Sequence, residues 1–339
     1  MLKVKLIEDK KIWDEFVSHV SIHTFFHSFE WADFNKNIGD QSEKYGFFED
    51  NKLVGVTLII KVFAKRGTFL FCPHGPLFKS DKINYWNFFL KFFIQKGLEE
   101  KVVFVRVSPA LAEDNKTQIM FKKNGFRNAP IHMSAESSWI LDLVDKSEDQ
   151  LLSEMRKTTR YEIRQAQKRE YTVIKSNDFK DLKIFLKLYH QTVSRTNFIP
   201  FSDKYIMEEF LAFSKNNQVM LFLEKHDNKI VAALMVIFYG KGAFYHQGAT
   251  NPTGRETVSY LAQWEAIKEA KQRGCTFYNF WGIAPTDDPK HPWYGLSLFK
   301  KGFGGKRVNF VHAQDYSIKF WRYLPIYLLE TMRRLKRNL

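Results

Sequence analysis

Two stretches of the chain repeat one pattern: Phe47-Phe48-Glu49-Asp50-Asn51-Lys52-Leu53-Val54 and Phe222-Leu223-Glu224 with Asp227-Asn228-Lys229-Ile230-Val231. Each stretch has an apolar run, an Asp-Asn pair suited to a tight turn, and a second apolar run, which predicts a β-hairpin. The match predicts an internal duplication whose period is near half the chain.

The elements around the two hairpins repeat in the same order. In the first half we expect a strand at 68–72, a helix capped at Asp81 that ends at Gln95, and a buried strand at 102–107. In the second half the corresponding segments are 243–247, 257–273 and 276–280. The expected fold is α+β, with two tandem domains that are each a mixed sheet flanked by helices. This order is compatible with the acyltransferase (GNAT-like) fold that binds acyl-CoA.

We place the first domain at 1–145 and the second at 146–317, and we expect C-terminal helices at 318–339 to pack on the first domain. Those helices form a basic and aromatic pair around Pro325. The pair could dock its apolar side on the first domain, lie on an anionic membrane surface, or do both.

The composition predicts an anionic partner. The chain of 339 residues is 45% hydrophobic and carries a net charge of +15, which favours nucleic acid, an anionic membrane or a phosphorylated substrate. Its two cysteines lack metal-binding or disulfide spacing, and no run reaches the ~18 apolar residues of a membrane span. We therefore expect a cytoplasmic protein with peripheral contact at the membrane, acting as a monomer without a metal or cofactor.

The stretch Phe299-Lys300-Lys301-Gly302-Phe303-Gly304-Gly305-Lys306-Arg307 combines aromatic, cationic and glycine residues. Glycines allow close approach of the backbone to a ligand, and the lysines favour an anion. Phe299 and Phe303 could stack on a base. The alternative is a hairpin turn with core phenylalanines and solvated lysines, and composition alone favours that alternative.

A second basic feature lies between the two halves, at 151–168. Arg156, Arg160, Arg164 and Lys168 recur every four residues, which predicts a continuous basic stripe on one helix. The stripe either faces an anion or is a solvated face relieved by nearby acids. The two interpretations carry equal weight.

Several motifs occur in an order that resembles the Fem family of peptidoglycan bridge-forming transferases. They are Pro73-His74-Gly75-Pro76, Arg156-Lys157-Thr158-Thr159-Arg160-Tyr161-Glu162-Ile163-Arg164-Gln165-Ala166, Gln263-Trp264-Glu265-Ala266, Tyr278-Asn279-Phe280-Trp281-Gly282-Ile283 and the 299–305 segment. The resemblance covers nearly the whole chain. It implies two acyltransferase-like domains, and the chain lacks the coiled-coil arm that some relatives insert.

The resemblance also implies an activity: transfer of an amino acid from aminoacyl-tRNA to the stem-peptide amino group of a peptidoglycan precursor, lipid II or UDP-MurNAc-peptide. By the same resemblance, Lys300 would be catalytic. Phe299 and Lys301 would bind tRNA, and we assign Arg156, Arg160 and Arg164 to tRNA as well. Trp31, Lys36, Arg195 and Tyr205 would bind the precursor.

The sequence departs from the family at Pro200-Phe201, Ser108 and Gln247, which leaves the acceptor open. One alternative function is an N-acyltransferase with an acyl-CoA or carrier-protein donor. The segment Ala249-Thr250-Asn251-Pro252-Thr253-Gly254-Arg255 lacks the pyrophosphate loop of such enzymes, which counts against CoA. The other alternative is a non-catalytic protein that binds tRNA or membrane. Asp287 and Asp288 are candidates for a general base by location only.

Overall fold

A computed structural model of the chain describes residues 1–80, 82–196, 200–251 and 258–337. The described chain divides into two compact units, Met1–Ser137 with Val308–Leu339, and Ser138–Arg307. These boundaries differ from the predicted ones because two strands pair elsewhere: β8 (Ser137–Asp142) joins the sheet of the second unit, and β15 (Gln314–Ser317) joins that of the first. Asp81 and Thr257, predicted near the starts of two helices, lie outside the described residues.

The first unit combines a set of strands with the helices that flank them. Its strands are β1 (Leu2–Leu6), β2 (Gln41–Glu49), β3 (Lys52–Ala64), β4 (Gly67–Pro73), β5 (Leu77–Phe78), β6 (Phe104–Ser108), β7 (Arg127–Asn128) and β15. Its helices are α1 (Lys10–Ser18), the short 3-10 helix η1 (Phe25–His27), α2 (Phe29–Asn37), α3 (Ile83–Glu99), α4 (Asn115–Lys123) and α11 (Phe320–Arg337).

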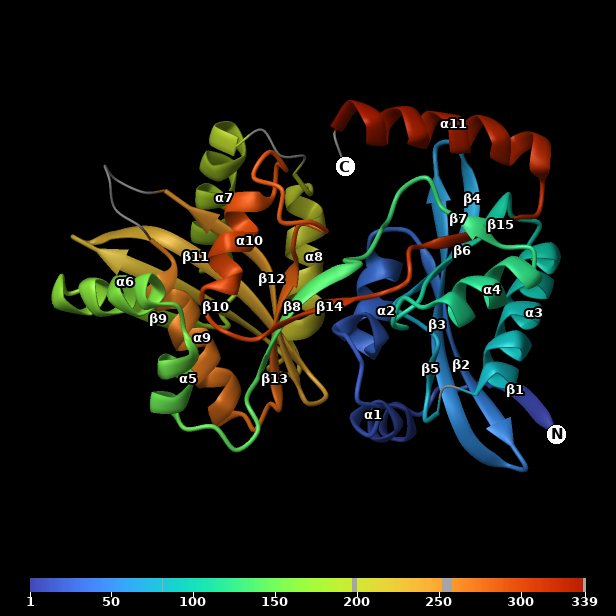
Figure 1. Ribbon diagram of the computed structural model, residues 1–339, viewed down its shortest axis with the longest axis horizontal. Helices are drawn as coiled ribbons and strands as arrows, with labels where there is room; N and C mark the ends of the chain where they lie inside the picture. Colours follow the sequence, from blue (N-terminus) through green and yellow to red (C-terminus); the bar gives the residue numbers. More distant parts are fainter. Residues whose placement is uncertain (81, 197–199, 252–257, 338–339) are drawn as a thin grey trace. The chain divides into compact units, whose positions relative to one another are not determined.

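The strands of this unit form a mixed sheet in the order β1-β2-β3-β4-β6-β15-β7, with β5 added beside β3. Helices α1 and α2 lie on one face of the sheet and α3 and α4 on the other (Figure 1). Alternation along β6 explains how both faces are filled, since Val105 and Val107 join the core under α3. Phe104 points the other way, and its ring lies 5.2 Å from that of Tyr323 on α11.

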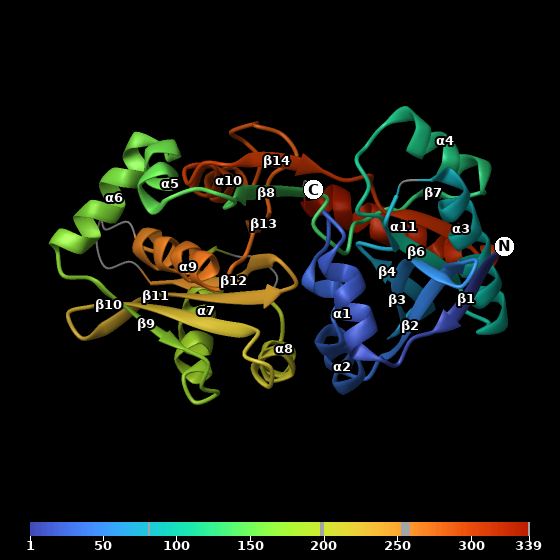
Figure 2. The ribbon, with the colours of Figure 1, turned by 90° about the horizontal axis from the view of Figure 1, so that it is seen from below.

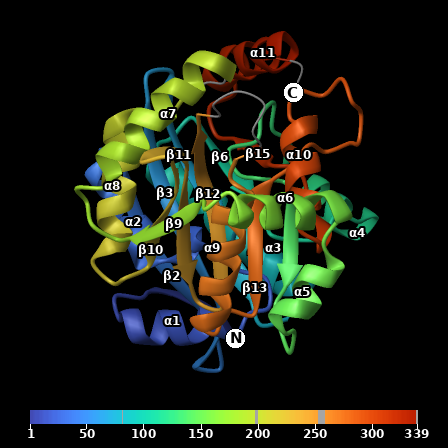
Figure 3. The ribbon, with the colours of Figure 1, turned by 90° about the vertical axis from the view of Figure 1, so that its left-hand side faces the viewer.

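The second unit has the same kinds of element. Its strands are β8, β9 (Thr172–Ser176), β10 (Val219–His226), β11 (Lys229–Tyr239), β12 (Gly242–Thr250), β13 (Phe277–Gly282) and β14 (Lys306–Asn309), whose last two residues belong to the first unit. Its helices are α5 (Glu148–Glu154), α6 (Lys157–Lys168), α7 (Leu182–Thr196), α8 (Asp203–Ser214), α9 (Tyr260–Gln272) and α10 (Tyr294–Lys301). Figures 2 and 3 show α9 on one face of this sheet and α7 and α8 on the other.

The strand order of the second sheet, read from β9, is β9-β10-β11-β12-β13-β8-β14, which repeats the order of the first sheet position by position. In each sheet the fourth and fifth strands are parallel, as β4 with β6 and β12 with β13. The predicted duplication is therefore present in the topology. The sixth strand of each sheet comes from a different place in the chain. In the first sheet it is β15, which follows the second unit along the chain, and in the second sheet it is β8, which precedes the other strands of its unit.

The two hairpins also repeat in detail. Asp50 and Asn51 have φ of 48° and 63°, and Asp227 and Asn228 have φ of 45° and 59°, the left-handed values of a two-residue hairpin turn. Each hairpin has a register shift at its third residue before the turn. Counted back from the turn, Phe47 corresponds to Glu224. The sequence alignment, which paired Phe47 with Phe222, was therefore shifted by two residues.

The C-terminal segment is one helix, α11, rather than the predicted pair, and it belongs to the first unit. Pro325 lies inside α11, in its second turn, where proline cannot donate the helical hydrogen bond to the carbonyl oxygen of Trp321. Within the described ranges, no helix has both the length and the apolar character needed to cross a bilayer.

Candidate active site

The candidate site is built around Lys300 in the last turn of α10. The Lys300 side chain is almost fully buried, with 5% of the residue exposed. Its Nζ donates a hydrogen bond of 2.6 Å to the carbonyl oxygen of Gly282 and lies 5.6 Å from the centre of the Tyr245 ring. Burial lowers the pKa of Lys300 from 10.5 to about 7, because the ammonium loses its hydration there. The amine therefore changes charge near neutral pH.

Two strands of the second sheet supply these contacts at the point where their pairing ends. The parallel pairing of β12 with β13 stops at Phe244 and Asn279. Tyr245 and Gly282 lie just beyond it, one on each strand. On β12 the next residue, His246, is an extra residue opposite Met235 and Val236, which makes a β-bulge. Bulges redirect side chains and often lie beside active sites. Lys300 therefore lies where the two strands cease to be paired.

Phe299, Lys301 and Arg156 surround the same end of α10. The Phe299 ring is half-buried, at 4.9 Å from the Tyr260 ring and 5.2 Å from the Phe303 ring. Lys301 forms an ion pair with the exposed carboxylate of Asp287. The backbone N–H of Arg156 donates to the carbonyl of Gly302 at 2.9 Å. The structure thus brings Arg156 together with Phe299, Lys300 and Lys301.

The predicted basic stripe is interrupted. The segment 151–168 is two helices, α5 and α6, and Arg156 stands at the break as the residue before α6. Arg160 turns back toward α5, where its guanidinium donates to the carbonyl oxygens of Ser153 at 2.8 Å and Met155 at 2.5 Å. Arg160 therefore caps the end of α5, while Arg164 is exposed farther along α6. A continuous stripe on one helix was wrong.

The glycines of this segment are explained by packing within the chain. A Cβ at Gly302 would lie 2.3 Å from Oγ1 of Thr159, and one at Gly305 would lie 2.4 Å from the carbonyl oxygen of Ile140. Gly305 also has a φ of 94°, which favours glycine. Phe303 is fully buried. Neither of the two predictions for this segment holds in full. The segment is not a hairpin turn with solvated lysines, and its glycines allow close packing within the second unit.

Arg195 and Tyr205 come from α7 and α8. Arg195 donates a hydrogen bond of 2.8 Å to Oγ1 of Thr250 at the end of β12. The Tyr205 ring stacks on Phe201 at 4.3 Å. Burial and the nearby carboxylate of Glu209 raise the pKa of Tyr205 well above 10.

A buried pair that sequence analysis missed connects Tyr205 with the surroundings of Lys300. Glu209 of α8 is fully buried and lies 2.9 Å from Nε2 of His246, the bulge residue of β12. The His246 ring lies 5.5 Å from that of Trp281, which precedes Gly282. Trp281 has a φ of 65°, an outlying value for a bulky residue and one that often marks functional sites. An acidic residue within the apolar face of α8 was the available sequence signal.

A second buried carboxylate that sequence analysis missed occupies the N-terminus of α9. Glu224 of β10 accepts hydrogen bonds from the backbone N–H groups of Ser259 at 3.3 Å and Ala262 at 2.8 Å. Burial raises the pKa of Glu224 from 4.5 to about 7. A helix N-terminus after a strand is where the acyl-CoA enzymes hold pyrophosphate. In this chain the Glu224 carboxylate already accepts hydrogen bonds from the backbone N–H groups at that helix N-terminus.

Asp287, a candidate base by location, is a poor proton acceptor. Its carboxylate pairs with Lys301 and accepts from Arg307 at 2.8 Å, and these cations lower its pKa. Residues 252–255 of the segment compared with a pyrophosphate loop lie outside the described residues.

Trp31 and Lys36 belong to α2 in the first unit. The Trp31 indole is 6% exposed and lies 4.6 Å from the rings of Phe26 and Phe34, so it is a core residue. Lys36, in the last turn of α2, is exposed. The structure does not bring these two side chains together.

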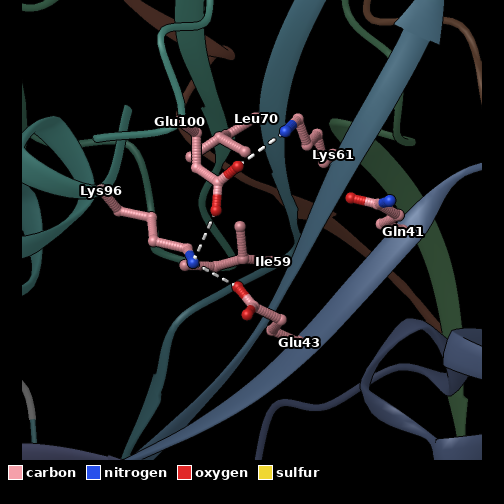
Figure 4. Close-up of a pocket in the computed structure, with 7 residues that line it drawn as sticks. All are labelled: Gln41, Glu43, Ile59, Lys61, Leu70, Lys96 and Glu100. Atoms are coloured by element: carbon pink, nitrogen blue, oxygen red, sulfur yellow. Dashed lines mark hydrogen bonds and ion pairs between the residues drawn. The ribbon is translucent and has the colours of Figure 1, made fainter. Parts of the chain in front are cut away.

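The first unit also has a polar hollow of about 220 Å³ on its sheet (Figure 4). The side chains that line it are Gln41, Glu43, Ile59, Lys61, Leu70, Lys96 and Glu100. Lys96 pairs with Glu43 at 2.5 Å and with Glu100 at 3.0 Å, and Lys61 pairs with Glu100 at 2.6 Å. Because both lysines are already paired with carboxylates, this hollow is a weaker candidate than the surroundings of Lys300.

Similar proteins share both the sequence and the fold. A lipid II:glycine glycyltransferase of Staphylococcus epidermidis is 22% identical over 360 residues, which cover 85% of this chain and 86% of that protein. The crystal structure of FemX matches with a TM-score of 0.82 at 20% identity, over 96% of this chain and 99% of that one. A tandem GNAT protein from the clavulanic acid biosynthesis pathway matches with a TM-score of 0.52 at 8% identity, over 94% and 98%. These structures confirm the predicted fold of two tandem GNAT-like domains. The FemAB family is matched over residues 9–223 and 214–330, and the chain therefore belongs to the FemAB family.

Proposed function

We propose that this protein transfers an amino acid from aminoacyl-tRNA to the stem-peptide amino group of a peptidoglycan precursor and so builds the interpeptide bridge. Membership of the FemAB family and the relatives named lipid II:glycine glycyltransferase support this function. The single observation that carries it is a buried lysine, Lys300, at the end of the β12–β13 pairing. A net charge of +15 suits two phosphate-bearing substrates.

Lys300 is the proposed catalytic residue. An aminoacyl ester is already activated, so the reaction needs positioning of the attacking amine and stabilisation of the oxyanion that forms on the ester carbonyl. The Lys300 ammonium donates to the carbonyl oxygen of Gly282, and a substrate oxyanion placed beside it would be a stronger acceptor. With a pKa of about 7, Lys300 is neutral in part of the molecules near neutral pH, and there the neutral amine, in place of the ammonium's role at the oxyanion, can accept the proton that the attacking amine releases.

The tRNA would lie at the exposed side of α10. Phe299 keeps part of its ring accessible, and a terminal base stacked there would contribute about 1–3 kcal/mol to binding. Arg156, Lys301 and the exposed Arg164 supply cations for the acceptor-stem phosphates. We keep Arg160 in this set only through its structural role at the end of α5.

Arg195 and Tyr205 are proposed to bind the precursor in the second unit, and Trp31 and Lys36 in the first. Arg195 can form bidentate bonds to phosphate, and the exposed Lys36 can neutralise it as a point charge. Because the Trp31 indole is buried, we assign it the support of α2 rather than direct stacking. The transfer assay described below offers both a lipid-linked and a nucleotide-linked precursor.

Glu224 argues against the acyl-CoA alternative. A pyrophosphate at the N-terminus of α9 would meet the buried Glu224 carboxylate, which already accepts from Ser259 and Ala262. Two anions at one helix N-terminus repel each other. A donor whose phosphates lie elsewhere, such as tRNA, avoids this conflict.

A transfer assay tests the proposal. Charged tRNAs are offered with lipid II or with UDP-MurNAc-peptide, and new amide products are sought by mass spectrometry. We expect product with aminoacyl-tRNA, none with acetyl-CoA, and a loss of at least about 100-fold for Lys300→Ala. Lys306→Ala, which removes a nearby exposed cation, is the matched control. Full activity of Lys300→Ala would refute its role, and tRNA binding without product on any precursor would favour the non-catalytic alternative.

A further inference from the structure

Helix α11 is apolar on two sides, and one of them has no place in the core of the first unit. On the inward side Tyr323 and Ile326 are buried, at 1% and 6% exposed. On the outward side large apolar side chains are open to solvent. They are Trp321 at 82%, Leu328 at 53%, Met332 at 61% and Leu335 at 66% exposed.

The exposed side chains form a single stripe. Trp321, Leu328, Met332 and Leu335 follow one another at intervals of seven, four and three residues, so they share one face of the helix. At 1.5 Å per residue the stripe runs for roughly 21 Å along α11. Single exposed apolar residues are ordinary, but a contiguous stripe marks an interaction surface.

The inward side is held firmly, so α11 presents the stripe from a fixed position. The hydroxyl of Tyr323 donates to Asp315 of β15 at 2.8 Å. Asp315 also accepts from Arg106 of β6 at 2.7 Å, and the same guanidinium donates to Glu330 of α11 at 2.9 Å. These buried contacts tie α11 to two strands of the sheet.

The charges of α11 are arranged for an anionic partner. Glu330, the one acidic residue in the sequence of α11, is turned inward to Arg106. Arg322, Arg333 and Lys336 are exposed and project along one edge of the stripe, about 70–130° around the helix from its centre. The outer surface of α11 is therefore apolar with cations beside it, as in helices that lie in the plane of a membrane interface.

We propose that the outward stripe of α11 docks on an anionic lipid bilayer, with Trp321 and the three aliphatic side chains inserted among the head groups. This goes beyond the transfer reaction, because it identifies the surface by which the first unit meets a membrane. Anionic head groups would neutralise Arg322, Arg333 and Lys336. A second copy of the chain fits less well, since it would bring its own exposed cations to the same edge without any acid.

Vesicle sedimentation of the full-length protein tests the proposal. Vesicles of phosphatidylcholine alone are compared with vesicles that also contain phosphatidylglycerol. We expect binding to the anionic vesicles and a loss of at least about tenfold for the double variant Leu328→Gln, Met332→Gln. The matched control is Leu98→Gln, Ile119→Gln, which removes two aliphatic residues that are 51% and 52% exposed on α3 and α4.

A second readout reports insertion directly. The contribution of Trp321 to the tryptophan emission is the part that is missing in the Trp321→Phe variant. In the wild-type protein this part should shift to shorter wavelength when anionic vesicles are added, because the indole leaves water. Transfer to a nucleotide-linked acceptor should be unchanged in the Leu328→Gln, Met332→Gln variant, which separates this proposal from the proposed function. Equal vesicle binding by that variant and by wild type would overturn the proposal. A second result would also overturn it: a wild-type protein that does not bind vesicles but forms a dimer, and a variant that does not form this dimer.

Discussion

Replacing Lys300 by methionine should stabilise the second unit while removing activity. Methionine keeps an unbranched side chain of similar length and removes the buried ammonium. Burial holds the pKa of Lys300 at about 7 in the folded chain, against 10.5 for an exposed lysine. Folding below pH 7 therefore takes a full positive charge out of water, and this penalty is absent from the variant.

The magnitude follows from the two pKa values. Between pH 7 and 10.5 the unfolded chain binds more protons at Lys300 than the folded chain, so wild-type stability rises with pH over this window. Each pH unit inside the window is worth about 1.4 kcal/mol, which puts the penalty at about 4 kcal/mol at pH 7 and about 2 kcal/mol at pH 9. The lost hydrogen bond to Gly282 costs about 1 kcal/mol. The variant should therefore gain about 3 kcal/mol at pH 7 and about 1 kcal/mol at pH 9.

Hydrogen exchange of β12 and β13 amides, measured in urea at pH 7 and pH 9, gives the free energy of unfolding of this region. Lys301→Met is the control, because it removes a positive charge from the same turn of α10 where the side chain is paired with Asp287 at the surface. The measured quantity is the change in the free energy of unfolding between pH 7 and pH 9, compared between the Lys300→Met and Lys301→Met variants. A Lys300→Met protein that is less stable than wild type at pH 7 would refute the reasoning.

Three further predictions concern other buried or capping charges. Arg106→Met should destabilise the first unit by about 3–5 kcal/mol in thermal unfolding, because the buried Asp315 loses the guanidinium that compensates it. Glu224→Gln should flatten the pH dependence of stability: burial raises the pKa of Glu224 to about 7, so wild type loses stability as pH rises from 4.5 to 7, and urea unfolding at pH 5 and 7.5 measures the difference. Arg160→Ala should lower the stability of the second unit by about 1 kcal/mol, through carbonyls left uncapped at the end of α5, and should weaken tRNA binding less than Arg156→Ala does.

Local sequence patterns were sufficient for the duplicated frame. Asp-Asn pairs between apolar runs specify the two hairpins, and the turns have nearly the same φ values in both units. The exchange of the sixth strands was out of reach, because β8 and β15 pair with strands more than a hundred residues away, and their sequences carry no signal of partner. The predicted domain boundaries differ from the compact units for that reason.

The site was predictable only in part. Lys300 was identified from a motif, but its burial depends on contacts with Tyr245 and Gly282 that spacing cannot show. The break between α5 and α6 carries no glycine or proline, although the Ser147–Gln150 capping box that starts α5 is visible in the sequence. Because this break was not predicted, Arg160 was assigned to a continuous basic stripe on one helix.

Comparing equivalent positions indicates which unit carries the chemistry. Phe47 and Glu224 occupy the same place in the two hairpins, directly before the register shift, and both are fully buried. A phenylalanine there only fills the core, whereas a carboxylate is costly to bury and is retained with a pKa near 7. The second unit also buries Lys300 near neutral pKa, while the buried Arg106 of the first unit is fully compensated by carboxylates. Uncompensated buried charge raises the free energy of the folded state, and it tends to persist where a reaction uses it. We therefore expect the catalytic residues to lie in the second unit.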